Sequence, residues 1–140
     1  MIRVYADIVG DLFHYGHVEF LRQARALGDY LLVGVCSEDI IEPSNRKPIL
    51  LMEERVASVA GCRYVDEVLP NAPWRIDRAW IRQHNIQLVV HGDDYSQEQL
   101  EDIYKVPMEI GILRTVPYTQ SISTTEIIRR VLERNTNLKK

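Results

Sequence analysis

The hydrophobic positions of this 140-residue chain fall into five short continuous runs, separated by stretches in which they are spaced differently. Continuous apolar runs of this length, bounded by polar or turn-forming residues, are typical of strands that are buried on both faces of a sheet. Five strands are therefore predicted, at 2–5, 30–36, 64–69, 87–91 and 111–117.

Helices are predicted between these strands, because apolar residues recur there three and four positions apart, at 18–27, 52–60, 76–80, 100–104 and 127–132. Local end signals agree with this interpretation. Gly28 and Gly61 follow two of the stretches, and Ser96 and Gln99 have the spacing of a capping box. The second helix is expected to bury one face, made of Met52, Val56, Val59 and Ala60.

Strands and helices alternate to the end of the chain, and the spacing leaves no room for hairpins. This alternation predicts an α/β fold, a Rossmann-like, doubly wound sheet of five parallel strands with helices on both faces, in a single domain over 1–140. In such sheets ligands bind beyond the carboxyl ends of the strands, where the strand order reverses. Polar clusters at 6–17, 91–95 and 118–125 follow strands one, four and five, so the site is expected there.

The composition excludes several classes of protein. Apolar residues make up 46% of the chain and charged residues 26%, which is ordinary for a globular protein, and a net charge of -3 does not favour a nucleic-acid partner or a basic membrane-binding face. The sequence contains no pattern typical of a signal peptide or a membrane span, which predicts a cytoplasmic protein. Cys36 and Cys62 lie in apolar runs without metal-ligand spacing, so both are expected to be buried free thiols.

The loop after the first predicted strand carries two histidines, His14 and His17, with Gly16 between them. The next helix begins close to the second histidine, so backbone N–H groups and the positive end of the helix dipole point toward one spot. Gly16 leaves room for a phosphate to approach the backbone. The pattern indicates a phosphate-binding site; two loop histidines that only bind their neighbours are the plainer alternative.

Several motifs resemble those of the cytidylyltransferases, a branch of the nucleotidyltransferase superfamily. Residues 11–17 read DLFHYGH, similar to the family's DLxHxGH motif, in which both histidines contact the phosphates of the nucleotide. Residues 63–68 read RYVDEV, which is shared by enzymes acting on phosphocholine, phosphoethanolamine and glycerol-3-phosphate. Further matches, in the same order as in the family, are VYAD at 4–7, NAPW at 71–74 and ISTT at 122–125.

The resemblance covers nearly the whole chain and implies an attack by a phosphate oxygen of the acceptor on the α-phosphorus of CTP, with Mg2+ present and pyrophosphate leaving. A phosphate monoester is already an anion at neutral pH, so such a site has to orient two anions and neutralise charge rather than supply a strong base. The resemblance implies that His14, His17 and Lys47 are catalytic, and it assigns no residue to a resident metal. For Lys47, a solvated loop charge is the alternative.

The resemblance also implies binding residues at matching positions. Asp94 stands where the family reads the cytosine amino group. Trp74, Tyr95 and Tyr104 match aromatic positions of the family's acceptor pocket, and an aromatic enclosure suits a cationic or alkyl head group. Plain turns and core packing are the alternatives for the aspartates and the aromatic residues. The nucleotide-binding residues are expected to be Ile8, Val9, Gly10, Asp11, Gly16, His91, Gly92, Asp94, Tyr118, Thr119, Ile122, Ser123 and Thr124. The acceptor-binding residues are expected to be Asp7, Arg46, Trp74, Asp93, Tyr95 and Tyr104.

A homodimer is a further implication, because in this family the RYVDE segment helps to form a two-fold interface. The alternative is that Arg63 and the carboxylates after it belong to a solvated surface.

Two motifs depart from the family's pattern. Residues 8–11 read IVGD, so isoleucine and glycine stand where glycine and phenylalanine are expected. Tyr118 and Ser121 replace the arginine and the glycine of the family's RTEGIST. Because a tyrosine hydroxyl carries no charge, another cation, such as Arg46, Arg114 or Arg129, has to reach the phosphates, or the acceptor differs. A phosphonate acceptor, such as 2-hydroxyethylphosphonate or 2-aminoethylphosphonate, therefore stays open.

Three other functions compete with this interpretation. An adenylyltransferase of the same superfamily would need an arginine at the position of Ile128, and an aminoacyl-tRNA synthetase would need a much longer chain with a basic face. A non-catalytic nucleotide-binding module is favoured only by Tyr118, and the presence of both histidines argues against it.

Overall fold

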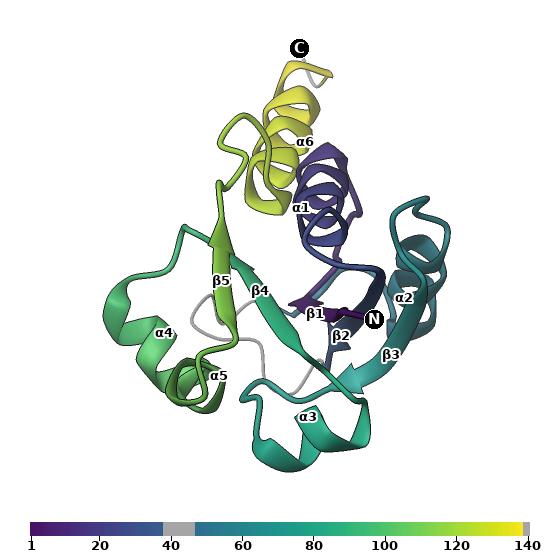
Figure 1. Cartoon of the computed structure of the whole chain (residues 1–140). Helices are drawn as coiled ribbons and strands as arrows, with labels where there is room; N and C mark the ends of the chain where they lie inside the picture. Colours follow the sequence, from purple (N-terminus) through teal and green to yellow (C-terminus); the bar gives the residue numbers. More distant parts are fainter. Residues whose placement is uncertain (38–46, 139–140) are drawn as a thin grey trace.

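The computed structural model describes residues 1–37 and 47–138, which build a five-stranded sheet with helices on both sides (Figure 1). All neighbouring strands are parallel, and their order is β3-β2-β1-β4-β5. The strand order therefore reverses between β1 and β4, and the predicted α/β class is confirmed. The strands are β1 (Arg3–Ile8), β2 (Tyr30–Cys36), β3 (Glu67–Ala72), β4 (Leu88–Gly92) and β5 (Leu113–Val116).

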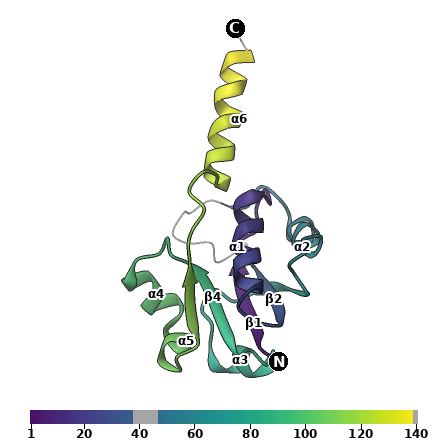
Figure 2. The same ribbon diagram turned by 45° about the horizontal axis from the view of Figure 1, so that its top comes forward.

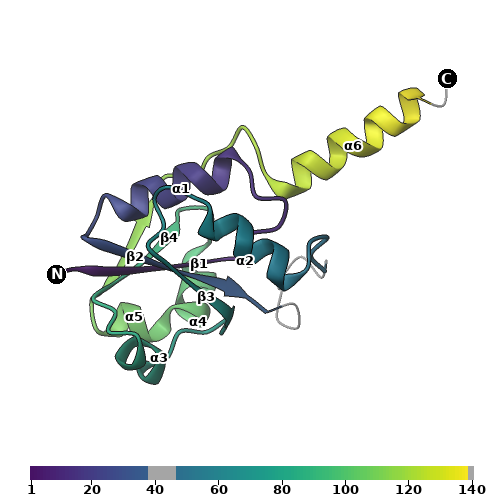
Figure 3. The ribbon, with the colours of Figure 1, turned by 90° about the vertical axis from the view of Figure 1, so that its right-hand side faces the viewer.

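The helices lie in two layers (Figures 1 and 3). The helices α1 (Tyr15–Arg25) and α2 (Met52–Ala60) cover one face of the sheet. The other face carries α3 (Arg78–Gln83), α4 (Gln97–Ile103) and α5 (Lys105–Glu109). The last helix, α6 (Thr124–Leu138), projects away from the rest of the described chain (Figures 2 and 3).

Two hydrophobic clusters fill the space between the sheet and these layers. Successive residues of a strand point to opposite faces, and accordingly Val4 and Ala6 join the cluster under α1 and α2, while Tyr5 joins the one under α3 and α4. Cys36 and Cys62 are buried free thiols, as predicted. None of the helices in the described ranges is both long and apolar enough to cross a bilayer.

The third strand differs from the prediction, since it covers Glu67–Ala72 rather than 64–69. The earlier residues form a turn, closed by the Val65 N–H, which donates to the carbonyl of Cys62. Asp66 N–H then donates to the carbonyl of Leu31 in β2. The strand then continues through Pro70, which reads as a strand end in the sequence. Proline is tolerated there because β3 is an edge strand, where a missing ladder donor costs little.

The buried face of α2 also differs from the prediction. Ala60 is exposed, whereas Arg55 is fully buried and donates through Nη1 to the carbonyl oxygens of Val9 and Cys36, at 2.8 and 2.9 Å. An arginine in this position was not expected, because its burial depends on two strand ends that lie 46 and 19 residues away in the sequence.

The helical structure breaks at Tyr104 between α4 and α5, which the sequence pattern did not predict, and Pro107 lies in the first turn of α5. Pro107 has no N–H to donate to the carbonyl of Ile103, four residues earlier, and its ring would clash there. The freed Ile103 carbonyl accepts instead from the N–H of Ile76, at 3.4 Å.

The predicted capping box at the start of α4 is confirmed, since Ser96 and Gln99 exchange side-chain and backbone hydrogen bonds.

Candidate active site

A cleft of about 350 Å³ opens beyond the carboxyl ends of β1 and β4, where the strand order reverses. Most of its lining comes from the three polar clusters singled out in the sequence, at 6–17, 91–95 and 118–125, and the rest from α1, the end of β2, Trp74 and the end of α4. The predicted site residues that line it are Asp7, Ile8, Val9, His14, Gly16, His17, Trp74, His91, Gly92, Asp94, Tyr95, Tyr104, Tyr118, Thr119, Ile122, Ser123 and Thr124.

The remaining predicted residues do not line this cleft. Gly10 and Asp11 lie behind it in the turn after β1, Lys47 is exposed on the segment before α2, and Asp93 is exposed after β4. Arg46 lies outside the described residues. Four lining residues were missed by the sequence reasoning because their apolar or small side chains gave no chemical signal: Phe20, Cys36, Ile103 and Thr125.

The two histidines form a reciprocal cap at the start of α1. His14 Nδ1 accepts the N–H of Gly16 at 3.0 Å, and His17 Nδ1 accepts the N–H of His14 at 3.1 Å. Because both Nδ1 atoms accept, the hydrogen of each neutral ring sits on Nε2, an assignment that rests on the hydrogen-bond network. A side chain on Gly16 would lie 2.8 Å from the His14 ring, so glycine is required for this packing.

Both histidines are held in the neutral form. Burial lowers the pKa of His14, and burial together with the nearby His14 lowers the pKa of His17 to about 3, although Asp11 acts in the opposite direction. Near neutral pH the pair therefore presents hydrogen-bond donors rather than positive charges.

The end of β1 supplies a buried carboxylate to the cleft. Asp7 accepts the hydroxyl of Tyr104 at 2.5 Å, and burial raises the Asp7 pKa while His91 and that hydroxyl lower it. The His91 ring lies between Tyr95 and Tyr104, with ring centres 4.2 and 5.1 Å away. The result is an aromatic enclosure with an acidic group at its base.

The loop after β4 brings a second carboxylate to the cleft, close to His91. His91 Nδ1 lies 2.8 Å from the carbonyl of Gly92 and must carry a hydrogen there, because a carbonyl only accepts. Asp94 Oδ1 is 3.9 Å from the same nitrogen. Asp93 instead accepts the N–H of Tyr118 at 2.9 Å and ties this loop to the lead into α6.

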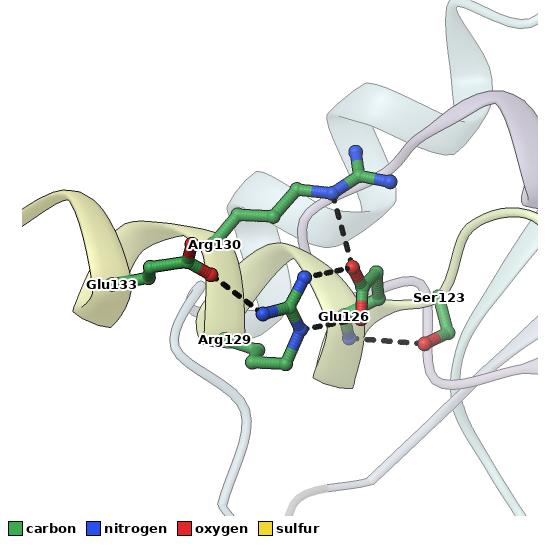
Figure 4. Close-up of polar contacts among 5 residues, drawn as sticks. All are labelled: Ser123, Glu126, Arg129, Arg130 and Glu133. Carbon is green, nitrogen blue, oxygen red and sulfur yellow. Dashed lines mark hydrogen bonds and ion pairs between the residues drawn. The ribbon is translucent and has the colours of Figure 1, made fainter.

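The start of α6 faces the histidines. Thr124 Oγ1 donates to the carbonyl of Asp11 at 2.8 Å and lies 3.5 Å from His14 Nε2. Ser123 Oγ accepts the N–H of Glu126 at 3.0 Å (Figure 4). Polar groups of α6 and the Nε2–H donors of α1 therefore meet at one side of the cleft, as an anion-binding corner requires.

Arg114 and Arg129 were expected as possible replacements for the family's arginine. Neither of them lines the cleft. Arg129 contacts Glu126 and Glu133 along α6, at 2.7 and 2.6 Å (Figure 4). Arg114 donates to the carbonyls of Gly111 and Leu113. The charged side chains that line the cleft within the described ranges are the carboxylates Asp7 and Asp94.

The family model described as "Cytidylyltransferase-like" matches residues 11–130, a range that contains both histidines and the start of α6. The chain belongs to the cytidylyltransferase-like family. The family membership expected from the DLFHYGH, RYVDEV and ISTT motifs is thereby confirmed.

Curated members of the cytidylyltransferase family are similar over nearly all of this chain. The ethanolamine-phosphate cytidylyltransferase of Dictyostelium discoideum is 44% identical over 135 residues, which cover 93% of this chain and 38% of that protein. The choline-phosphate cytidylyltransferase A of Homo sapiens is 41% identical over 134 residues, covering 94% of this chain and 36% of that protein. This chain thus spans less than two-fifths of these relatives' length.

Solved structures support the same fold. A lipopolysaccharide core biosynthesis protein from Thermoplasma volcanium superposes with a TM-score of 0.69 at 24% identity, covering 87% of this chain and 99% of that one. A pantothenate synthetase from Thermus thermophilus superposes with a TM-score of 0.61 at 13% identity, covering 91% of this chain and 61% of that one. At these identities the likeness concerns the fold alone.

Proposed function

We propose that this chain transfers CMP from CTP to the phosphate of a small phosphorylated amino alcohol, of the ethanolamine-phosphate or choline-phosphate kind, and releases pyrophosphate. The observation that carries the proposal is that two clusters of contacting side chains line the cleft, named the histidine half and the acidic half. The histidine half holds His14, His17 and the polar start of α6, and the acidic half holds Asp7 and aromatic rings. Asp94 keeps its predicted place at the cytosine amino group.

The histidine half suits the triphosphate. His14 and His17 offer Nε2–H donors, and Ser123 and Thr124 lie beside the free N–H groups of the first turn of α6. Donors that are already in place stabilise the charge that develops on the α-phosphate and on the leaving pyrophosphate without reorganisation. His14, His17 and Lys47 are the proposed catalytic residues; Lys47 would add the positive charge that the neutral histidines lack.

The acidic half suits a cationic head group. The buried carboxylate of Asp7 attracts an ammonium ion, and the rings of Tyr95, Tyr104 and Trp74, which line the same cleft, can contact it. A glycerol phosphate would leave the Asp7 carboxylate without a counter-charge, so ethanolamine phosphate or choline phosphate is the better fit. The named relatives act on those two compounds and therefore support this choice. They give no support to a phosphonate acceptor.

Mg2+ enters the proposal only as part of the substrate, as the complex of CTP with the ion. Among the described residues, no group of three or more histidine, cysteine or acidic side chains is arranged to hold a metal, so no step is assigned to a resident ion. The acceptor phosphate needs no base, and the work of the chain is to orient the two anions for in-line attack.

A 31P NMR assay tests the proposal directly. The protein is incubated with CTP, Mg2+ and, separately, phosphoethanolamine, phosphocholine, glycerol-3-phosphate, 2-hydroxyethylphosphonate or 2-aminoethylphosphonate. We expect a CDP-alcohol signal and pyrophosphate with the first two acceptors. A signal only with the phosphonates would replace the proposed acceptor, and CTP binding without turnover of any acceptor would indicate a non-catalytic module.

The variant His14→Ala links that activity to the cleft. Loss of one preorganised donor is expected to lower kcat by about 100-fold or more, as at other anion-stabilising sites. His84→Ala is the matched control, because His84 caps the end of α3 and does not line the cleft. Equal activities of the two variants would contradict the assignment of His14.

A further inference from the structure

Asp11 is a buried carboxylate that the cleft itself does not use. It is 2% exposed and does not line the cleft, although the resemblance placed it among the nucleotide-binding residues. Its two oxygens accept the backbone N–H groups of Ile49 and Leu50, each at 2.9 Å. A carboxylate that accepts two N–H donors and is shielded from water forms a strong, directional tie between two segments.

The segment held in this way carries Lys47. It leads from Lys47 through Pro48 into α2, and the side chains of Ile49 and Leu51 are 57% and 55% exposed, so apolar packing does little to fix it. The two hydrogen bonds from Asp11 join it to the turn that carries the histidines, 38 and 39 residues earlier in the chain.

The turn around Asp11 is built to aim its side chain inward. Gly10 and Leu12, on either side, both have positive φ, at +71° and +48°. For a leucine this conformation costs about 1 kcal/mol or more and persists only where the surroundings enforce it. The carbonyl of Asp11 also accepts the Thr124 hydroxyl, so one residue contacts the histidine turn, the Lys47 segment and the start of α6.

We propose that Asp11 is a positioning residue: its carboxylate holds the Lys47 segment against the histidine turn, so that Lys47 and the histidines act on the same phosphate. The inference rests on the proposed function for the role of Lys47. The tie itself can be tested without any activity.

Amide hydrogen exchange tests the tie. In Asp11→Asn one oxygen becomes an NH2 group, which cannot accept, so exchange at Ile49, Leu50 or both should become about tenfold faster. Amides of α1 and β1 should keep their protection, which also shows that the variant folds. Asp29→Asn is the matched control, because Asp29 accepts the N–H of Ile2 at 2.7 Å at an exposed position outside the cleft. Unchanged exchange at both Ile49 and Leu50 in Asp11→Asn would overturn the proposal.

A double-mutant cycle tests whether Asp11 acts through Lys47. The values of kcat/KM are compared for wild type, Asp11→Asn, Lys47→Ala and the double variant. We expect a loss of at least tenfold from Asp11→Asn in the wild-type background and less than threefold in the Lys47→Ala background. Equal losses in both backgrounds would show that Asp11 acts by another route.

Failure of the proposed function gives a different result. If the wild type transfers CMP to none of the acceptors, the dissociation constant of CTP is measured for the same four proteins. The affinity lost through Asp11→Asn is then compared between the wild-type and the Lys47→Ala backgrounds. Because hydrogen exchange requires no turnover, faster exchange at Ile49 and Leu50 in an inactive protein would separate a real tie from a wrong function.

Discussion

His14 and His17 show how one pair of side chains combines a structural and a chemical task. Each uses Nδ1 to cap the first turn of α1, which leaves Nε2–H as the remaining donor of a ring that lines the cleft. Protonation of either Nδ1 would remove an acceptor from a backbone N–H, so the same proton would weaken the helix start and change the anion site.

The stability of the protein should therefore depend on pH through His17. Its folded-state pKa of about 3 lies below the ordinary value of 6.5, so between these values the unfolded chain binds a proton that the folded chain does not. By linkage this group's contribution is fully present above pH 6.5 and is lost toward pH 3, with a slope of up to about 1.4 kcal/mol per pH unit.

Urea unfolding at several pH values between 4 and 7.5 measures this contribution. The matched variant is His17→Asn, since the asparagine Oδ1 takes the place of Nδ1 as acceptor without titrating. Between pH 7 and pH 4 the wild type should lose more unfolding free energy than the variant. Parallel curves would show that His17 keeps an ordinary pKa.

At the scale of elements, the strand–turn–helix unit of β1 and α1 depends on close packing around Gly16. A methyl group there would lie 2.8 Å from His14 Cε1 and 3.3 Å from the carbonyl of Ile122, which belongs to the lead into α6. One small residue thus allows two elements of the site to approach each other.

Gly16→Ala should displace the His14 ring from its capping position. We expect a loss of about 1–3 kcal/mol in unfolding free energy, typical of overpacking, together with a lower kcat/KM for CTP. The control is Gly61→Ala at the end of α2, where φ is -79° and the nearest atom to a new methyl would be 3.5 Å away. Thermal unfolding and the 31P assay compare the two; equal stability would contradict the packing argument.

At the scale of the whole molecule, the homodimer expected from the RYVDEV motif stays a prediction. The two carboxylates of the motif are used within the chain: Asp66 accepts the N–H of Leu31 at 2.8 Å and contacts Arg25, and Glu67 accepts the Tyr30 hydroxyl at 2.8 Å. Arg63 is exposed and makes no hydrogen bond or ion pair with the rest of the described chain, so it is the residue of the motif left to meet a second copy.

Reversal of that charge should weaken the dimer. We expect light scattering after gel filtration to give twice the chain mass of 16.3 kDa for the wild type and a lower average mass for Arg63→Glu. Arg78→Glu, at the exposed start of α3, should leave the mass unchanged. If the wild type has the mass of one chain, the prediction of a homodimer is wrong.

Features that depend on neighbours a few residues away could be predicted from the sequence alone. The 30–36 and 52–60 ranges match β2 and α2, the Ser96–Gln99 box caps α4, and the polar clusters after strands one, four and five line one cleft. These features follow from hydrophobic spacing, end signals and the geometry of parallel sheets, which are local or hold for the whole fold class.

Contacts between groups that are distant in the sequence became visible only in the folded chain. Arg55 is buried because two strand ends supply acceptors, Pro70 lies in a strand because that strand is at the edge, and Asp7 contacts Tyr104 across 97 residues of sequence. The tie from Asp11 to Leu50 is of the same kind. Such contacts depend on the relative placement of whole elements, and a local pattern carries no signal for a partner that the fold brings in from elsewhere.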